Sequence, residues 1–220
     1  MKIIAKIHTD FKEKFGIPRQ SGLSASRGKI VFEKPFRNPD ALRGIEEYSH
    51  LWIIWQFSES IREIFTPTVR PPRLGGNKKV GVFATRSPFR PNPIGLSSVK
   101  LLSVEEEVGL GTVLYVEGAD MLDGTPIYDI KPYITYTDSH PEAKSSFAEK
   151  EYGKRLEVVL SDGLAESLSE EERTEICALL SEDPRPSYQE DSSREYGMLW
   201  GKRELFFKVK GETLYVTGIK

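Results

Sequence analysis

The residues best suited to chemistry in this sequence are arginines that stand among prolines. Arg86 and Arg90 lie in a stretch that contains three prolines within six residues, namely Pro88, Pro91 and Pro93. Proline fixes φ and removes a backbone donor, so this stretch is expected to form a rigid, extended loop. A rigid loop lowers the entropy that its arginines lose when they bind a ligand. A structural corner, with arginines bonded to nearby carbonyls, is the alternative, but polar loops on a β scaffold favour a ligand site.

Three further segments combine turn residues with polar side chains, at 17–22, 123–133 and 183–188. The Asp-Gly-Thr-Pro sequence that opens the second is good turn chemistry and by itself indicates nothing more. In the third, helix termination accounts for Asp183 and the proline after it. It does not account for Arg185 and Tyr188, which follow closely.

Several common catalytic signatures are missing from the sequence. There is no Walker-type phosphate loop, no dinucleotide fingerprint after a strand, no Gly-x-Ser-x-Gly elbow and no His-Glu-x-x-His. Cys177, the single cysteine, excludes an internal disulfide and fits a reducing compartment. It falls within an expected amphipathic helix, where core packing is the expected role. One cysteine and three scattered histidines also argue against a structural zinc site, and we expect no metal.

The formal net charge of −2 conceals two unlike halves. Residues 1–104 contain 18 Lys and Arg against 8 Asp and Glu, a net charge of +10, whereas residues 105–220 contain 13 against 25, a net charge of −12. Segment 66–98 has no acidic residue, and its basic residues are Arg70, Arg73, Lys78, Lys79, Arg86 and Arg90. A charged segment is often just a solvated face. Because this one is rich in Pro and Gly, it favours basic loops that meet an anionic partner, nucleic acid being the first candidate.

The elements that must position these residues are mostly strands. Strands are expected at 2–8, 28–33, 51–57, 79–84, 96–104, 112–117 and 130–136. Segment 51–57 is continuously apolar, which predicts a strand buried on both faces. No long amphipathic helix separates the strands, so the pattern predicts an antiparallel barrel or sandwich. No apolar run approaches the roughly 20 residues of a membrane span, and Lys6 and His8 interrupt any signal peptide, so a cytoplasmic protein is expected.

The composition changes after about residue 139. Ser169 and Glu172 form a capping-box pattern that predicts a helix over 167–181, with apolar positions at Leu168, Ile176, Leu179 and Leu180. Segments 204–209 and 213–219 flank a short turn and predict a hairpin. The chain is therefore interpreted as a β-barrel domain at 1–139 and a small α+β domain at 140–220.

The polar clusters occur in an order that identifies a family. There are five such motifs: Pro-Arg-Gln at 18–20, the Arg-Pro-Pro-Arg-Leu-Gly-Gly run at 70–76, the arginine-proline run at 84–95, Asp-Gly-Thr-Pro at 123–126 and Asp-Pro-Arg-Pro-x-Tyr at 183–188. In these motifs the sequence resembles the TsaA-like (YaeB-like) family, which contains the TrmO-type tRNA (adenine-N6)-methyltransferases. The resemblance covers about residues 7–188. It implies an antiparallel β-barrel that binds S-adenosyl-L-methionine without a Rossmann fold, a small C-terminal domain and a homodimer. The implied reaction is methyl transfer to N6 of threonylcarbamoyl-adenosine at position 37, next to the anticodon of threonine tRNA.

The resemblance also implies where the cofactor binds. Carried over by position, the cofactor-binding residues are Pro18, Arg19, Gln20, Arg86, Leu96, Asp123, Gly124, Thr125 and Pro126. One departure stands after the strand at 51–57, where the family often has Phe-His-Gln and this chain has Phe57, Ser58 and Glu59. A cofactor contact at Ser58 and Glu59 would therefore run through the backbone.

The substrate side needs a base, because the acceptor N6 is conjugated with both the purine and the carbamoyl group and is a poor nucleophile. Asp183 and Tyr188 are the candidates, with Arg185 placed to hold a carboxylate or phosphate. His50 is an alternative base, although a histidine that opens an apolar strand is more often simply packed. The residues expected to meet the tRNA are Arg70, Arg73, Lys78, Lys79 and Arg90. A non-catalytic cofactor- or RNA-binding module and a methyltransferase for a small-molecule acceptor are the alternatives.

Overall fold

The N-terminal part of the chain is a closed six-stranded barrel. The computed structural model describes residues 1–220 except 72–73, 75–76, 152 and 186–190. The barrel strands are β1 (Ala5–Thr9), β2 (Arg27–Phe32), β3 (His50–Gln56), β6 (Ile94–Glu107), β7 (Gly111–Glu117) and β8 (Thr125–Pro132). Their order is β1-β2-β7-β6-β3-β8, and every pairing is antiparallel. The predicted mainly-β fold with an antiparallel barrel is confirmed.

Inward-facing residues of these strands form the barrel core. In β1 the burial alternates strictly, with Ala5, Ile7 and the hydroxyl-bearing Thr9 inside, as expected for a strand with one solvent-facing side. The prediction that segment 51–57 is buried on both faces is wrong. β3 alternates between buried residues and half-buried residues. On its outer face, the half-buried Trp52 contacts the Tyr133 ring at a centroid separation of 5.4 Å, and its Nε1 donates to Asp138 Oδ2 at 2.9 Å.

Short helical segments and loops connect the strands. They are the 3₁₀ turns η1 (Lys34–Phe36), η2 (Pro39–Leu42), η3 (Ile45–Glu47), η4 (Ser58–Ser60), η6 (Val82–Ala84) and η7 (Ser146–Glu151), the helix α1 (Thr135–Asp138) and the two-stranded ribbon β4 (Thr68–Val69) with β5 (Val80–Gly81). The strand expected at 79–84 is thus only two residues long, because the chain turns into η6. The strand expected at 130–136 begins at Thr125 and ends at Pro132, after which α1 follows.

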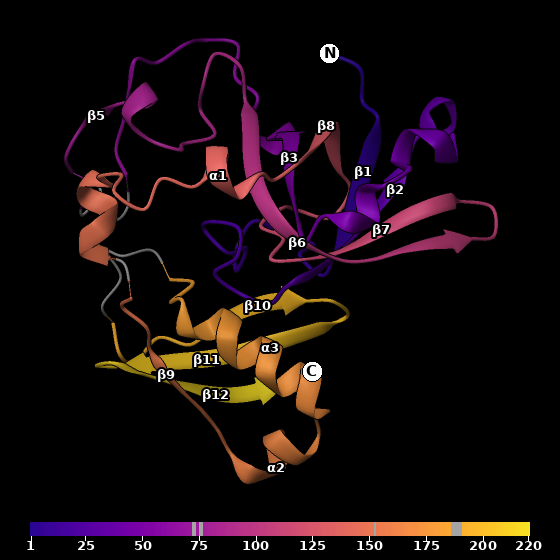
Figure 1. Ribbon diagram of the computed structural model, residues 1–220. Coiled ribbons are helices and arrows are strands. Elements are labelled where there is room, and N and C mark those ends of the chain that lie inside the picture. The colour runs from indigo at the N-terminus through magenta and orange to yellow at the C-terminus, as the bar shows by residue number, and fades with distance from the viewer. Residues whose placement is uncertain (72–73, 75–76, 152, 186–190) are drawn as a thin grey trace.

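The C-terminal part is a four-stranded sheet with two helices, and Figure 1 shows it below the barrel. Its strands are β9 (Glu157–Leu160), β10 (Tyr196–Trp200), β11 (Arg203–Lys210) and β12 (Thr213–Ile219), in the order β10-β11-β12-β9, and β9 runs parallel to β12. The helices are α2 (Asp162–Glu166) and α3 (Glu170–Ser181). The predicted hairpin is confirmed, and so is the capping box: the Ser169 side chain accepts from Glu172 N, and Glu172 Oε2 accepts from Ser169 N. Four helix positions predicted to be apolar all contribute to the core of this unit.

The segment after β1 ties the two units together. Phe11 is 1% exposed and packs in the C-terminal core rather than in the barrel core. Asp10 O accepts from Gly201 N at 2.9 Å, and Glu13 Oε1 accepts from Leu199 N at 3.0 Å. Gly16 has φ +90° and lies so close to Met198 that a Cβ would be 2.4 Å from the methionine methyl carbon. The C-terminal sheet is thereby fastened to the barrel. Among the described residues, no helix is long and apolar enough to cross a membrane.

Candidate cofactor and substrate site

A cavity of about 620 Å³ opens at one end of β3 and β6. Its walls include Lys14 and the loop at 17–21, residues of β3 with η4, the proline-rich loop with the start of β6, and the segment that leads from β7 into β8. These include segments that the sequence singled out as polar clusters. Strand pairing brings them together, because β3 is hydrogen-bonded to both β6 and β8.

Trp55 and Asp120 both line the cavity and form what is here called its floor, and the buried Ser97 joins them by hydrogen bonds. Trp55 Nε1 donates to Ser97 Oγ at 2.9 Å, and Ser97 Oγ donates to Asp120 Oδ1 at 2.6 Å. The indole of Trp55 lies over Gly95, where a Cβ would be 2.2 Å from the ring. Only glycine allows the ring to occupy this position. The Phe57 ring packs against Trp55 with a centroid separation of 4.2 Å.

The position of Asp120 in the cavity wall alters the pKa of its carboxyl. Burial raises the pKa of its carboxyl to about 6, against the hydrogen bond from Ser97 and the positive charge of Arg86. Sequence analysis did not select Asp120, Trp55 or Ser97. The available signal was weak: Asp120 is an acidic residue between Ala119 and Met121, both of which are fully buried.

Polar contacts join the loop at 17–21 both to the proline-rich loop and to the segment after α3. Arg86 Nη1 donates to Gln20 Oε1, so the loop after β1 and the proline-rich loop are directly bonded. Arg19 Nη2 donates to Asp183 O at 3.1 Å and to Arg185 O at 2.8 Å. One side chain of the cavity therefore reaches the C-terminal cluster.

Hydrogen bonds within the proline-rich loop hold its shape. Arg90 Nη1 donates to Thr85 O at 2.7 Å and to Val82 O at 3.3 Å. The Thr85 and Ser87 hydroxyls accept from Ser87 N and Phe89 N, respectively. The structural-corner interpretation therefore applies to Arg90, while Arg86 points across the cavity to Gln20.

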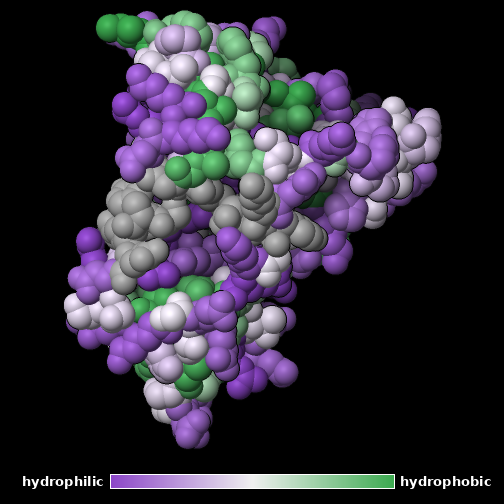
Figure 2. Space-filling view, turned by 90° about the vertical axis from the view of Figure 1, so that its left-hand side faces the viewer, coloured by the Kyte–Doolittle hydropathy of each residue, from purple (hydrophilic) through white to green (hydrophobic). Residues whose placement is uncertain are grey.

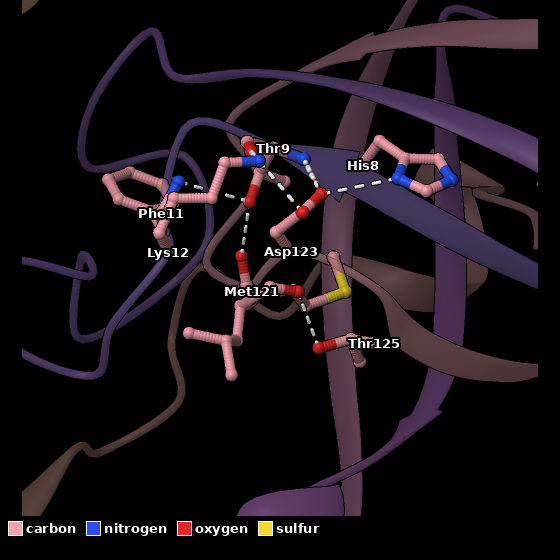
Figure 3. Close-up of polar contacts among 8 residues, drawn as sticks. His8, Thr9, Phe11, Lys12, Met121, Asp123 and Thr125 are labelled. Carbon is pink, nitrogen blue, oxygen red and sulfur yellow. Dashed lines mark hydrogen bonds and ion pairs between the residues drawn. The ribbon is translucent and has the colours of Figure 1, made fainter. Parts of the chain in front are cut away.

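The Asp-Gly-Thr-Pro turn braces the start of the chain (Figure 3). Asp123 Oδ2 accepts from Lys12 Nζ at 2.7 Å, and Asp123 Oδ1 accepts from Thr9 N at 3.1 Å and lies 3.2 Å from His8 Nδ1. Although burial raises it, the hydrogen bonds from Lys12 and Thr9 hold the pKa of Asp123 below its usual value. Thr125 Oγ1 donates to Leu122 O at 2.6 Å and closes the turn. Of the four turn residues, only Thr125 lines the cavity.

Most residues predicted to bind the cofactor line this one cavity. They are Pro18, Arg19 and Gln20 from the first loop, Ser58 and Glu59 from η4, and Arg86, Leu96 and Thr125. Asp123, Gly124 and Pro126 do not line it. The Glu59 carbonyl accepts from Lys14 Nζ at 2.6 Å, so the backbone of η4 is held in place. The binding roles of all these residues stay predictions.

The residues predicted to act on the substrate are more dispersed. Asp183 has φ +49° and accepts from Arg185 through both oxygens, at 2.8 Å from Nε and 2.9 Å from Nη2. The Nδ1 of His50 lies 3.0 Å from Ser49 Oγ; the residue is exposed and does not line the cavity.

Arg70, Lys78 and Lys79 are exposed around β4 and β5, whereas Arg90 lines the cavity. Arg73 and Tyr188 lie outside the described residues. In the described part of the chain, no three His, Cys, Asp or Glu side chains are grouped to hold a metal.

Comparisons with known proteins agree along the whole chain. The model of the tRNA-methyltransferase O N-terminal domain matches residues 6–139, and that of the TrmO C-terminal domain matches residues 144–220. The Escherichia coli tRNA (adenine(37)-N6)-methyltransferase is 40% identical over 204 residues, which is 89% of this chain and 86% of that protein. A putative S-adenosylmethionine-dependent methyltransferase of Pseudomonas aeruginosa is 39% identical over 218 residues, covering 90% and 87% of the two chains. The crystal structure of TrmO from Pseudomonas aeruginosa superposes with a TM-score of 0.78 at 31% identity, covering 99% of this chain and 94% of that one. The chain belongs to the tRNA-methyltransferase O family.

Proposed function

We propose that this protein is an S-adenosyl-L-methionine-dependent methyltransferase that modifies N6 of threonylcarbamoyl-adenosine at position 37 of tRNA, with threonine tRNA as the substrate. The carrying observation is the single cavity that gathers eight residues predicted to bind the cofactor from separate parts of the sequence. Relatives that cover most of the chain are named as adenine-37 tRNA methyltransferases.

The residues of the cavity fit this cofactor. A cavity of about 620 Å³ lies in the range of about 300–1,000 Å³ common for ligand sites. Trp55, Phe57 and Leu96 offer apolar surface for the adenine and the aliphatic chain, while Gln20 and Arg86 offer polar groups at the rim. Bound here, the cofactor would supply an electrophilic methyl group on a positively charged sulfur. The protein's part is to orient that group toward the acceptor and to keep water away.

The exposed basic residues near the cavity support a tRNA substrate. Arg70, Lys78 and Lys79 carry no resolved carboxylate partner closer than 4.0 Å among the described residues, and all three are exposed. Lysine and arginine at such positions neutralise backbone phosphates and give affinity without reading sequence. Asp183, which Arg19 links to the cavity, is proposed as the base that takes the N6 proton, with Tyr188 as the other candidate, and Arg185 is proposed to hold a carboxylate or phosphate of the substrate.

We also propose that the protein is a cytoplasmic homodimer. Ile61, Ile64, Phe65 and Phe83 are each more than half exposed, and the rings of Phe65 and Phe83 lie 6.3 Å apart. Figure 2, which faces the side of the molecule that carries β5, shows hydrophobic residues grouped in its upper half. An exposed apolar group of this kind is typical of an interface. A single species of monomer mass in sedimentation equilibrium at micromolar concentration would contradict the dimer.

Two measurements test the proposed activity. Isothermal titration with S-adenosyl-L-methionine is expected to show binding, and mass spectrometry of nucleosides is expected to show a methylated product from threonylcarbamoylated tRNA. Arg86→Ala tests whether this cavity binds the cofactor, and the variant is expected to lose binding. The exposed side chain bonds to Gln20, so its removal leaves the core intact. Cofactor binding without any methylated nucleoside would indicate a non-catalytic module instead. Activity on a small-molecule acceptor but not on tRNA would favour the remaining alternative.

A further inference from the structure

We propose that the Asp120 carboxylate recognises the positive charge of the methyl donor at the floor of the cavity. The inference rests on the proposed function, since it takes the cavity to be the S-adenosyl-L-methionine site. Asp120 lies in the segment between β7 and β8, outside every motif that carried the family resemblance. The assignment follows from how this side chain is held.

The hydrogen-bond chain gives the Asp120 carboxylate a fixed direction. Ser97 Oγ accepts the indole proton of Trp55 at 2.9 Å, so its own proton is directed to Asp120 Oδ1 at 2.6 Å. The residues on either side of Asp120, Ala119 and Met121, are fully buried and anchor the backbone. A side chain fixed in this way is preorganised for a ligand and loses little entropy on binding.

The carboxylate lacks a cation that would repay its burial. Among the described residues no lysine or arginine forms an ion pair with Asp120, and Arg86, whose positive charge acts on it without direct contact, is bonded to Gln20. Burying an ionised carboxylate without a cation is costly, and here that cost appears as a raised pKa. A cationic ligand group beside Asp120 would offset this cost of burying the charge.

The other charged groups that line the cavity do not offer this role. The basic ones are Lys14, Arg19, Arg86 and Arg90, and each donates to a backbone or side-chain oxygen of the protein. Glu59 is the other carboxylate of the lining, and it is exposed at the rim on η4. Asp120 is therefore the one partly buried anion that a positively charged ligand meets in the described lining.

A nucleic-acid acceptor is the less suitable partner for Asp120. The acceptor base must enter from the open side of the cavity, where Leu96 is 56% exposed and Arg86 is exposed. Asp120 is instead linked through the buried Ser97 to Trp55, which is only 5% exposed. This position favours contact with the cofactor over a role as the base that takes the N6 proton.

The test compares three ligands that differ in charge. S-adenosyl-L-methionine has a positive sulfur and an ammonium group, S-adenosylhomocysteine has only the ammonium group, and methylthioadenosine has neither. Titration calorimetry at pH 7.5 is expected to show that Asp120→Asn weakens S-adenosyl-L-methionine at least 10-fold and leaves methylthioadenosine within twofold. Weakened S-adenosylhomocysteine would identify the ammonium group as the partner, and unchanged S-adenosylhomocysteine would identify the sulfur.

The control is Asp129→Asn, the same isosteric change on β8 outside the cavity, which is expected to leave all three affinities unchanged. Equal weakening of all three ligands by Asp120→Asn would indicate a structural role and overturn the proposal. So would unchanged affinity for S-adenosyl-L-methionine. If the wild-type protein fails to bind S-adenosyl-L-methionine at all, the proposed function fails and not merely this inference.

The pH dependence gives a second readout. Because the cation is expected to bind the ionised carboxylate, affinity for S-adenosyl-L-methionine should fall as pH drops below 6, while lysine and arginine groups of the lining stay charged. Methylthioadenosine affinity should stay flat over the same range. If Asp120→Asn fails to fold, Ser97→Ala provides the test. The variant loses the hydroxyl that donates to the Asp120 carboxylate and lowers its pKa, so the pH at which affinity for S-adenosyl-L-methionine is half lost should rise. A midpoint unchanged in Ser97→Ala would contradict the inference.

Discussion

At the scale of single residues, the floor of the cavity depends on Gly95. Replacing it with alanine puts a methyl group 2.2 Å from the Trp55 ring, so the indole must move and its bond to Ser97 is strained. Overpacking of this kind costs about 1–3 kcal/mol. We expect Gly95→Ala to fold with a lower melting temperature and to bind S-adenosyl-L-methionine at least 10-fold more weakly.

The matched control is Gly81→Ala, since a Cβ at Gly81 meets nothing within 4 Å. It should change neither melting temperature nor affinity. Wild-type affinity in Gly95→Ala would show that the position of Trp55 does not matter for the ligand.

Ionisation of Asp120 is expected to lower the stability of the ligand-free protein, although the ionised form is the one proposed to bind the cation. Its carboxyl has a folded-state pKa of about 6, above the value of 3.8 for a free aspartate, so the folded protein favours the protonated form. The stabilising effect of protonation is present below pH 4 and is lost as pH rises toward 6. A shift of about two units corresponds to about 3 kcal/mol at neutral pH.

Asp120→Asn removes this penalty. In urea unfolding without ligand, the free energy of unfolding of the variant relative to the wild type is expected to increase between pH 4 and pH 7, by at most about 3 kcal/mol. An asparagine variant that is less stable than the wild type at pH 7.5 would mean that the charged form is stabilised by contacts of the folded state.

The difference between prediction and structure at this scale has a physical cause. Residue type and spacing were enough to select Gln20 and Arg86, because polar side chains among prolines and glycines are visible in the sequence. The environment of Asp120 is made by closing a barrel, which brings Ser97 and Trp55 to it from strands far away in the chain. The spacing of residues also does not reveal that the Asp123 carboxylate accepts hydrogen bonds from Lys12 and Thr9.

At the scale of elements, the capping box of α3 is the clearest local determinant. Ser169→Ala removes the acceptor of Glu172 N and should lower the free energy of unfolding by about 1 kcal/mol. Thr174→Ala is the control on the same helix: the residue is exposed, and alanine has the higher helix propensity, so stability should stay equal or rise. Chemical denaturation measures both. Equal losses in the two variants would mean that the box contributes nothing special.

In the C-terminal unit, elements set by local signals were predictable, whereas two strands set by long-range pairing were not. The hairpin of β11 and β12 follows from alternation around a turn, and α3 follows from its cap. β9 is four residues long and is a strand because it pairs in parallel with β12, more than fifty residues later. β10 likewise depends on its pairing with β11. β3 looks buried throughout in sequence because the residues of its outer face are also largely apolar, although they are only half-buried.

At the scale of the whole molecule, the uneven distribution of charge predicts salt-dependent tRNA binding. Each phosphate contact contributes about 0.7–0.9 to the slope of log affinity against log salt. Lys78→Glu with Lys79→Glu should weaken tRNA binding strongly and flatten that slope, while leaving S-adenosyl-L-methionine affinity unchanged. The control is Lys202→Glu with Lys210→Glu, an equal charge change on exposed residues of the acidic C-terminal unit. Filter binding across salt concentrations compares them, and equal effects would mean that net charge alone governs binding.

The two units share a core residue, which couples their unfolding. Phe11 belongs by sequence to the barrel but is buried in the C-terminal core, beside hydrogen bonds from Gly201 and Leu199 to the same segment. Phe11→Ala is expected to cost about 3–5 kcal/mol, as for a buried aromatic residue. Amide exchange should rise first in β10 and β11 and less in β2 and β7. Tyr136→Ala, at a residue 91% exposed, is the control and should change neither. Exchange that rises only in the barrel would contradict the shared core. Equal rises throughout would indicate that the units unfold as one, so that residues 140–220 alone, which lack Phe11, could not form a stable fold.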